Sequence, residues 1–220
     1  MAFGKNWEWR GFGAIPPELR ERLELLPSRY PSRQDLTDEY LWVQGSPVNI
    51  KLRFSDLKFK RLIERDCGLE RWLEDPAENY SFPIGREVLL QLATDLGVSI
   101  PVMPHGAVDR SALLALLEKS TPAVRLVAVT KSRWQRKWTE GGSAGEGVTV
   151  EVAQILSPEI TWSVGVESPE SDLVRKAVEA LGLEGVLRRL NYLEALGVWV
   201  KGHRVSAEKT SQGPGLRRSP

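Results

Sequence analysis

The sequence predicts an α+β protein in which antiparallel strands close into a barrel around a polar interior, with helices packed on the outside. Strand-like segments alternate polar and apolar side chains, so each has one polar and one apolar face. Helical segments carry apolar stripes, such as Leu89, Leu92 and Leu96, that need a sheet face to cover. If helices cover the apolar faces, the polar faces must look elsewhere, and a barrel curled around them meets that need.

Composition narrows the class of protein before any motif is considered. The chain has 220 residues, a formal net charge of +1, 41% hydrophobic residues and a single cysteine, Cys67. This is enough apolar material for a core, and one cysteine excludes a disulfide framework or a cysteine-based zinc site. No apolar run reaches eighteen residues and the first 22 residues hold no signal-peptide core, so we expect a cytoplasmic protein without contact to a membrane. The near-zero net charge argues against polyanion binding by bulk charge.

Elements follow from periodicity and from helix-end signals. Prolines open the first helix, Asp109 is an N-cap, and Gly97 and Gly182 end helices as C-caps. The predicted strands cover residues 6–12, 38–43, 48–54, 56–64, 123–138, 148–156, 159–167 and 198–201. The predicted helices cover residues 18–26, 86–96, 109–118, 171–181 and 187–196. We expect residues 1–202 to form one domain and the polar residues 203–220 to form a disordered tail.

The polar strand faces are sorted by charge sign. Bases share a face on the middle strands, and acids stand on the first strand and on the two late strands. A sheet with one solvated face gives the same alternation, but it does not explain the sorting. A barrel interior lined by Lys and Arg on some strands and by Glu on others suits a highly anionic ligand held with a divalent metal. These polar positions are Glu8, Arg10, Lys51, Arg53, Lys58, Lys60, Lys131, Arg133, Glu151 and Glu167.

The order of these motifs resembles the CYTH superfamily, the triphosphate tunnel metalloenzymes that include class IV adenylyl cyclases and thiamine triphosphatases. The resemblance covers about residues 3–201. The E-x-E-x-K strand of the family is matched by residues 6–10, its basic strands by 51–53, 58–60 and 131–133, and its late acids by Glu151 and by 165–167. A closing helical segment is echoed by residues 189–196.

The resemblance implies an eight-stranded tunnel that holds a triphosphate together with Mg²⁺ or Mn²⁺. By this parallel, the catalytic residues are Glu8, Arg10, Lys58 and Lys60, the substrate-binding residues are Lys51, Arg53, Lys131 and Arg133, and the metal ligands are Glu8, Glu151 and Glu167. The expected partner is a small anionic triphosphate, inorganic or carried on a nucleoside or thiamine. The expected activity is its metal-dependent binding and hydrolysis.

The chain departs from the family pattern at three positions. Asn6 and Gly165 replace two of the acids, and Arg10 replaces a lysine. Phosphate binding therefore follows from the sequence more directly than hydrolysis does. A tunnel that binds polyphosphate or nucleotide with weakened catalysis is one alternative. A second is single-stranded nucleic-acid binding by residues 133–137, which is less favoured because tryptophans and bases are expected on opposite faces. Cyclisation of ATP also remains open.

Overall fold

The computed structural model describes residues 4–29, 33–140 and 147–205. The strands are β1 (Gly4–Gly13), β2 (Gln34–Trp42), β3 (Val48–Arg53), β4 (Asp56–Asp66), β5 (Leu69–Glu74), β6 (Asn79–Ser81), β7 (Arg125–Trp138), β8 (Val148–Ser157), β9 (Thr161–Ser168) and β10 (Arg188–Arg189). The helices are α1 (Pro17–Leu25), α2 (Arg86–Leu96), α3 (Arg110–Glu118), α4 (Ser171–Leu181) and α5 (Tyr192–Val200), with a short 3₁₀ turn at Pro76–Glu78. None of the helices in these ranges is long and apolar enough to cross a membrane.

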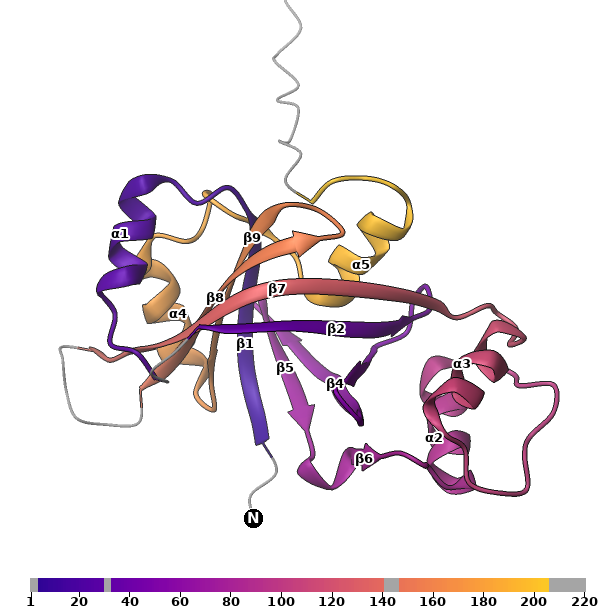
Figure 1. Cartoon of the computed structure of the whole chain (residues 1–220). Coiled ribbons are helices and arrows are strands. Elements are labelled where there is room, and N and C mark those ends of the chain that lie inside the picture. Colours follow the sequence, from indigo (N-terminus) through magenta and orange to yellow (C-terminus); the bar gives the residue numbers. More distant parts are fainter. Residues whose placement is uncertain (1–3, 30–32, 141–146, 206–220) are drawn as a thin grey trace, which may run out of the picture.

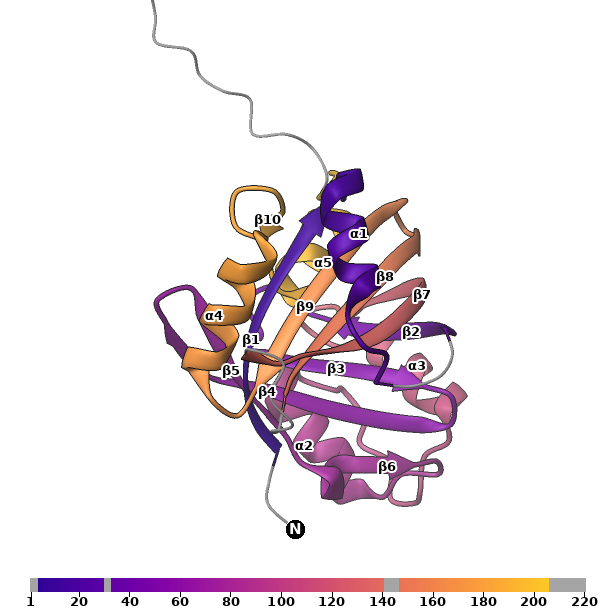
Figure 2. The ribbon, with the colours of Figure 1, turned by 90° about the vertical axis from the view of Figure 1, so that its left-hand side faces the viewer.

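Eight of the strands close into an antiparallel barrel (Figures 1 and 2). Around the barrel they run β1-β5-β4-β3-β2-β7-β8-β9, and β9 pairs again with β1. The two short strands are additions, because β6 pairs with β4 and β10 pairs with β1. The predicted fold class, a closed barrel with helices outside, is confirmed.

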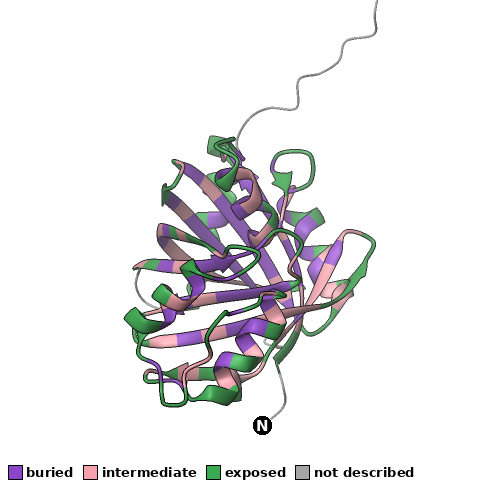
Figure 3. Cartoon of the chain, turned by 90° about the vertical axis from the view of Figure 1, so that its right-hand side faces the viewer, coloured by how far each residue is buried: buried purple, intermediate pink, exposed green. Residues whose placement is uncertain are grey.

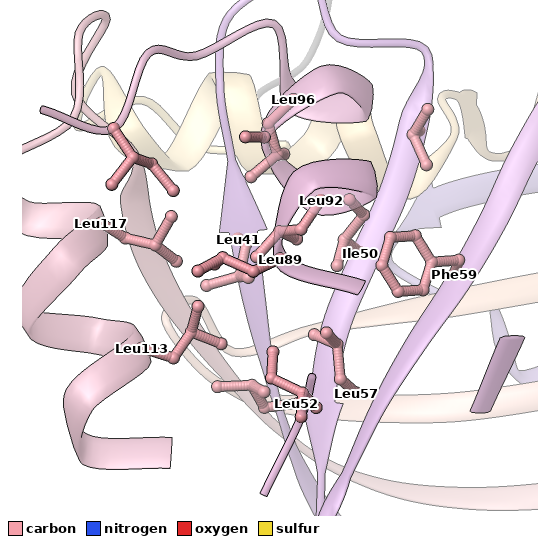
Figure 4. Close-up of a cluster of buried hydrophobic side chains, with 14 of the residues drawn as sticks. Leu41, Ile50, Leu52, Leu57, Phe59, Leu89, Leu92, Leu96, Leu113 and Leu117 are labelled. Carbon is pink, nitrogen blue, oxygen red and sulfur yellow. The ribbon is translucent and has the colours of Figure 1, made fainter. Parts of the chain in front are cut away.

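Helices cover the barrel on two sides. In Figure 1, α1 and α4 lie together on one side and α2 and α3 on the other. Leu89 and Leu92 of α2 and Leu113 of α3 pack against the outward side chains of β3 and β4, such as Ile50 and Phe59 (Figure 4). A second cluster joins α1 and α4 to the outward side chains of β1, β8 and β9. Burial follows this layering, since the strands are mostly buried and the loops mostly exposed (Figure 3).

One end of the barrel interior is filled by apolar side chains. Phe12, Tyr40 and Ile155 point inward from the strands and pack against Tyr192 and Leu196 of α5. Phe12 and Tyr192 meet edge to face, with ring centres 5.4 Å apart. Such aromatic contacts add to the free energy already gained by burial. Helix α5 therefore closes this end, and only the remaining part of the interior is left for polar side chains.

The eighth barrel strand is not the predicted one. Residues 198–201 were expected to form it, but 198–200 belong to α5, which begins at the capping box of Asn191 and Glu194. The eighth strand is β5, whose Leu, Glu and Arg residues favour helix and hide the strand. Cys67 and Gly68, both with positive φ, join β4 to β5 by a two-residue turn. That turn is the sequence signal that the prediction missed.

Part of the predicted tail, residues 203–205, lies within the described structure. Residues 206–220 of that prediction lie outside the described residues. Val205, inside the predicted tail, is fully buried beside α5, and its backbone N–H donates to Glu159 at 2.8 Å. Residues 203–205 thus belong with the barrel, because Val205 adds an apolar side chain to the closed end.

Two adjacent leucines of α2 test the layering. Leu89 is 0% exposed and Leu90 is 43% exposed. We expect Leu89→Ala to lower the free energy of unfolding by about 2–5 kcal/mol because it leaves a cavity between α2 and the barrel. Leu90→Ala should cost less than about 1 kcal/mol. Urea denaturation of both variants measures this, and equal losses would contradict the layering.

Candidate functional site

A cavity of about 280 Å³ lies inside the polar part of the barrel. The side chains that line it are rich in charge, with six bases and four acids. They are Arg10, Lys51, Arg53, Lys60, Lys131 and Arg133, and Glu8, Glu74, Glu151 and Glu167. Strands from all around the barrel supply them, because alternation turns every second side chain inward. Burial of this many charges is costly unless they are paired or serve a ligand.

Nine of the ten site residues predicted from the sequence line this one cavity. The exception is Lys58, which pairs with Lys51 on β3 and with Asn79 on β6. Lys58 is half-buried and shares the inward strand face with Lys60, but it is not among the side chains that line this cavity. Asn6, which shares a strand face with Glu8, does not line it either. The cavity thus begins at Glu8 on β1.

The acids and bases alternate in an ion-pair chain across the barrel wall. Lys60 Nζ lies 2.7 Å from Glu8 Oε2, and Arg10 Nε lies 2.6 Å from Glu8 Oε1. Arg10 Nη1 lies 3.2 Å from Glu151 Oε1, and Arg133 Nη1 lies 3.0 Å from Glu151 Oε2. Both carboxylates are therefore shared between two bases. The chain ends on a base at each side, so it carries one positive charge in excess.

These pairs decide the protonation of the two acids. Burial raises the pKa of Glu8, but Lys60 and Arg10 outweigh it and lower the pKa to about 2. Burial also raises the pKa of Glu151, and the nearby Lys131, Arg10 and Arg133 together lower that pKa far below its usual range. Both groups are carboxylates at any physiological pH.

Gly165 leaves the space that Arg10 occupies in the ion-pair chain. Gly165 on β9 lies between Arg10 on β1 and Glu151 on β8 in the strand register. A Cβ atom at position 165 would come within 2.4 Å of Arg10 Nη2. The arginine side chain therefore crosses the bare backbone of Gly165 to reach Glu151. Ser163 Oγ accepts a further hydrogen bond from Nη1 at 3.0 Å, and the guanidinium carbon lies 4.9 Å from the centre of the Tyr192 ring.

Asp38 is a charged residue of the barrel interior that the sequence prediction missed. It is fully buried on β2 and accepts hydrogen bonds from Arg53 at 2.5 and 2.7 Å, while Lys131 Nζ lies 3.5 Å away. Burial raises the pKa of Asp38, but Arg53, Lys51 and Lys131 lower it well below its usual range. The signal in the sequence was an acid two residues before Tyr40, on the same strand face. Asp38 holds two of the predicted substrate-binding bases in position.

Three charged groups of the cavity, Lys51, Glu74 and Glu167, have no ion pair among the described residues. Lys51 makes no hydrogen bond, and its ammonium lies 5.9 Å from the centre of the Tyr40 ring. Burial lowers the pKa of Lys51 to about 7. Glu167 lies opposite Glu8 in the sheet, and burial raises the pKa of Glu167 more than Lys60 lowers it. The buried Trp72 Nε1 and Asn49 Oδ1 also lack hydrogen-bond partners and line the same cavity. Unpartnered polar atoms that line a charged cavity are typical of a ligand site.

The predicted metal ligands do not form a metal site as they stand. Every carboxylate oxygen of Glu8 and Glu151 already accepts from a base, and the third predicted ligand, Glu167, has no ion pair with a described residue. Within residues 4–29, 33–140 and 147–205, no three His, Cys, Asp or Glu side chains come together closely enough to hold a metal ion. Mg²⁺ and Mn²⁺ prefer free carboxylate oxygens, so this donor set does not fit them.

The stretch 133–137 does not form a single surface. Arg133 and Gln135 line the charged cavity inside the barrel. Trp134 and Arg136 face outward, where they line a separate cavity of about 240 Å³ beside α1. A strand alternates its faces, so the five residues cannot present one continuous patch to a nucleic acid strand.

Comparison with known proteins identifies only distant similarities. No family model matches the chain, and no curated protein matches it. A conserved hypothetical protein from Pyrococcus furiosus is 15% identical over 86% of this chain and 98% of that chain, with a TM-score of 0.49. A protein from Pyrococcus horikoshii OT3 is 16% identical over 85% and 98%, with a TM-score of 0.47. A protein described as a putative adenylate cyclase from Bacillus halodurans is 11% identical over 82% and 92%, with a TM-score of 0.38. The function must therefore be argued from the cavity.

The pKa of Lys51 leads to a prediction about stability. Between about pH 7 and pH 10.5 the folded protein binds fewer protons at Lys51 than the unfolded chain does. Charged Lys51 therefore lowers the free energy of unfolding. This loss is fully present below pH 7, shrinks as the pH rises, and is gone above pH 10.5. We expect Lys51→Met to raise the free energy of unfolding by about 1–3 kcal/mol at pH 6 and by less at pH 9. Thermal denaturation at both pH values measures this, with Lys58→Met as the control. A lower melting temperature at pH 6 would contradict it.

Proposed function

We propose that the barrel cavity binds a short polyphosphate, with inorganic triphosphate as the reference ligand. The observation that carries this proposal is the convergence of six bases on one cavity, in which Lys51 forms no ion pair with a described residue. A buried lysine whose charge is unfavourable in the empty cavity gains most from a bound anion. Arginine side chains add donors in the fork geometry that suits phosphate oxygens.

The size of the cavity supports a compact anion. Its volume of about 280 Å³ lies just below the range for small-molecule sites, roughly 300–1,000 Å³. An inorganic phosphate chain is more compact than a nucleotide, because it carries no base or sugar that the cavity would have to accommodate. Its dense charge also matches a wall where the bases exceed the acids. Trp72 Nε1 and the free N–H groups of Arg10 Nη2 are donors that a phosphate oxygen would satisfy.

We infer from the motif order that the chain is a divergent relative of the CYTH superfamily. The closed barrel and the nine motif residues in one cavity support this inference. Hydrolysis is the further step that the resemblance implies, with Glu8, Arg10, Lys58 and Lys60 as catalytic residues. It stays a prediction, because the carboxylates that would hold the metal are engaged by bases. Binding is therefore the function that the geometry supports best.

Titration calorimetry with sodium tripolyphosphate tests the binding. We expect Lys51→Ala and Arg133→Ala each to weaken binding by about 10–100-fold, since a hydrogen bond to a charged group contributes about 1.5–3 kcal/mol. Lys58→Ala is the matched control, because it removes the lysine opposite Lys51 that does not line the cavity. Its affinity should stay within about threefold of the unmodified protein.

The same experiment separates the alternatives. Absence of binding, or equal losses in Lys51→Ala and Lys58→Ala, would refute the proposed site. Phosphate release from tripolyphosphate, ATP or thiamine triphosphate would extend the function to hydrolysis, and formation of cyclic AMP would extend it to cyclisation.

Binding should be coupled to proton uptake. Lys51, with a pKa of about 7, is mostly neutral at pH 8, and a bound anion raises that pKa. We expect uptake of up to about one proton per anion at pH 8 and little at pH 6. Calorimetry in Hepes and Tris buffers measures the uptake, and Lys51→Met corrects for the protonation of the ligand itself. Uptake that Lys51→Met leaves unchanged would contradict this role of Lys51.

A further inference from the structure

We propose that the guanidinium of Arg10 takes the place of a divalent cation between Glu8 and Glu151, so that the cavity binds its anion without Mg²⁺ or Mn²⁺. The part of this proposal that concerns the anion rests on the proposed function. The part that concerns the cation stands on the geometry of the cavity alone.

The first support is the position of Arg10 between two acids of different strands. Its Nε bonds to Glu8 on β1 at 2.6 Å, and its Nη1 reaches Glu151 on β8 at 3.2 Å. A cation shared by these two carboxylates would lie between them, and the guanidinium already fills that space. Lys60 and Arg133 take the outer oxygens of the same two acids at 2.7 and 3.0 Å. Each carboxylate oxygen of the pair thus already accepts a hydrogen bond from a base.

The second support is that the barrel wall is shaped for this side chain. The register places Arg10, Gly165 and Glu151 in one row across β1, β9 and β8. Any side chain at position 165 would meet the guanidinium, because even a Cβ atom would lie 2.4 Å from Nη2. Ser163 supplies an acceptor at 3.0 Å and Tyr192 supplies a ring face. A side chain at position 165 would therefore require the Arg10 guanidinium to move from its place beside Glu151.

The consequence for the ligand follows from the chemistry of arginine. A guanidinium stays charged at every physiological pH, so the charge of this site does not depend on the supply of metal. Glu8, Glu151 and Ser163 use Nε and Nη1, and Nη2 makes no hydrogen bond with a described residue. Its two N–H groups remain as donors for a phosphate oxygen.

Manganese binding without any anion tests the cation. Electron paramagnetic resonance of Mn²⁺ titrated into the protein should detect no ion bound in the cavity of the unmodified chain. Arg10→Ala frees Glu8 and Glu151 and should raise Mn²⁺ affinity by at least about tenfold. Arg53→Ala is the matched control, because it also removes a cavity arginine but frees only Asp38. Mn²⁺ binding to the unmodified protein that Glu151→Gln abolishes would overturn the proposal. A folded Arg10→Ala variant without gained affinity would do the same.

Anion binding with and without metal completes the test and does not need Arg10→Ala to fold. We expect the dissociation constant of tripolyphosphate in EDTA to be no more than about twofold weaker than in Mg²⁺ or Mn²⁺. Binding that requires metal would overturn the metal-free site while leaving the proposed function intact. Absence of binding in both conditions would instead refute the proposed function, and the manganese titration would still decide the place of Arg10.

Discussion

The salt bridges from Arg10 to Glu8 and Glu151 are the interaction on which the interior of this barrel depends. Removal of Glu8 would take away the acid that pairs with Lys60, and removal of Glu151 would take away the acid that pairs with Arg133. Loss of one partner of a buried ion pair costs several kcal/mol. The salt bridge from Arg10 to Glu151 also links β1 to β8 across β9. This salt bridge therefore forms only when the barrel closes by pairing β1 with β9. Lys60 and Arg133 extend the same pattern outward. The positive charge left over at the ends of this chain is what the cavity can offer to an anion.

Stability and binding are divided between the two faces of the sheet. The outward side chains pack under α1 and α4 on one side and under α2 and α3 on the other, and the apolar half of the interior packs against α5. Burial of apolar surface in these three clusters stabilises the fold. This stabilisation offsets the cost of charged groups that are desolvated elsewhere without an ion pair. Lys51 and Glu167 are such groups, because each is half-buried in the charged half without an ion pair to a described residue. A fold that keeps them is consistent with a cavity shaped for a ligand rather than for stability.

Two of the three positions at which the sequence departs from the family it resembles lie side by side in the structure. Arg10 is longer than the lysine of the motif, and its guanidinium reaches across β9 to Glu151. Gly165 lacks the acid of the motif and leaves open the space that this guanidinium crosses. Asn6 lies outside the lining of the cavity, so the loss of its charge removes nothing from the ion-pair chain. The changes at positions 10 and 165 therefore belong together, and each explains the other.

The sequence by itself determined the barrel class, four of the five helices and nine of the ten cavity residues it predicted, because alternation and helix caps are local and survive without tertiary context. Tertiary structure alone decided which acids meet which bases, since strand register and the space over Gly165 bring Arg10 between Glu8 and Glu151. It also decided that β5, and not residues 198–201, completes the barrel. Val198 and Val200 are β-branched and favour a strand, but the capping box of α5 and the packing of its apolar side chains outweigh that preference. The face of a strand that carries charged side chains can be predicted from the sequence. Which acid pairs with which base depends on the register and the distances between strands.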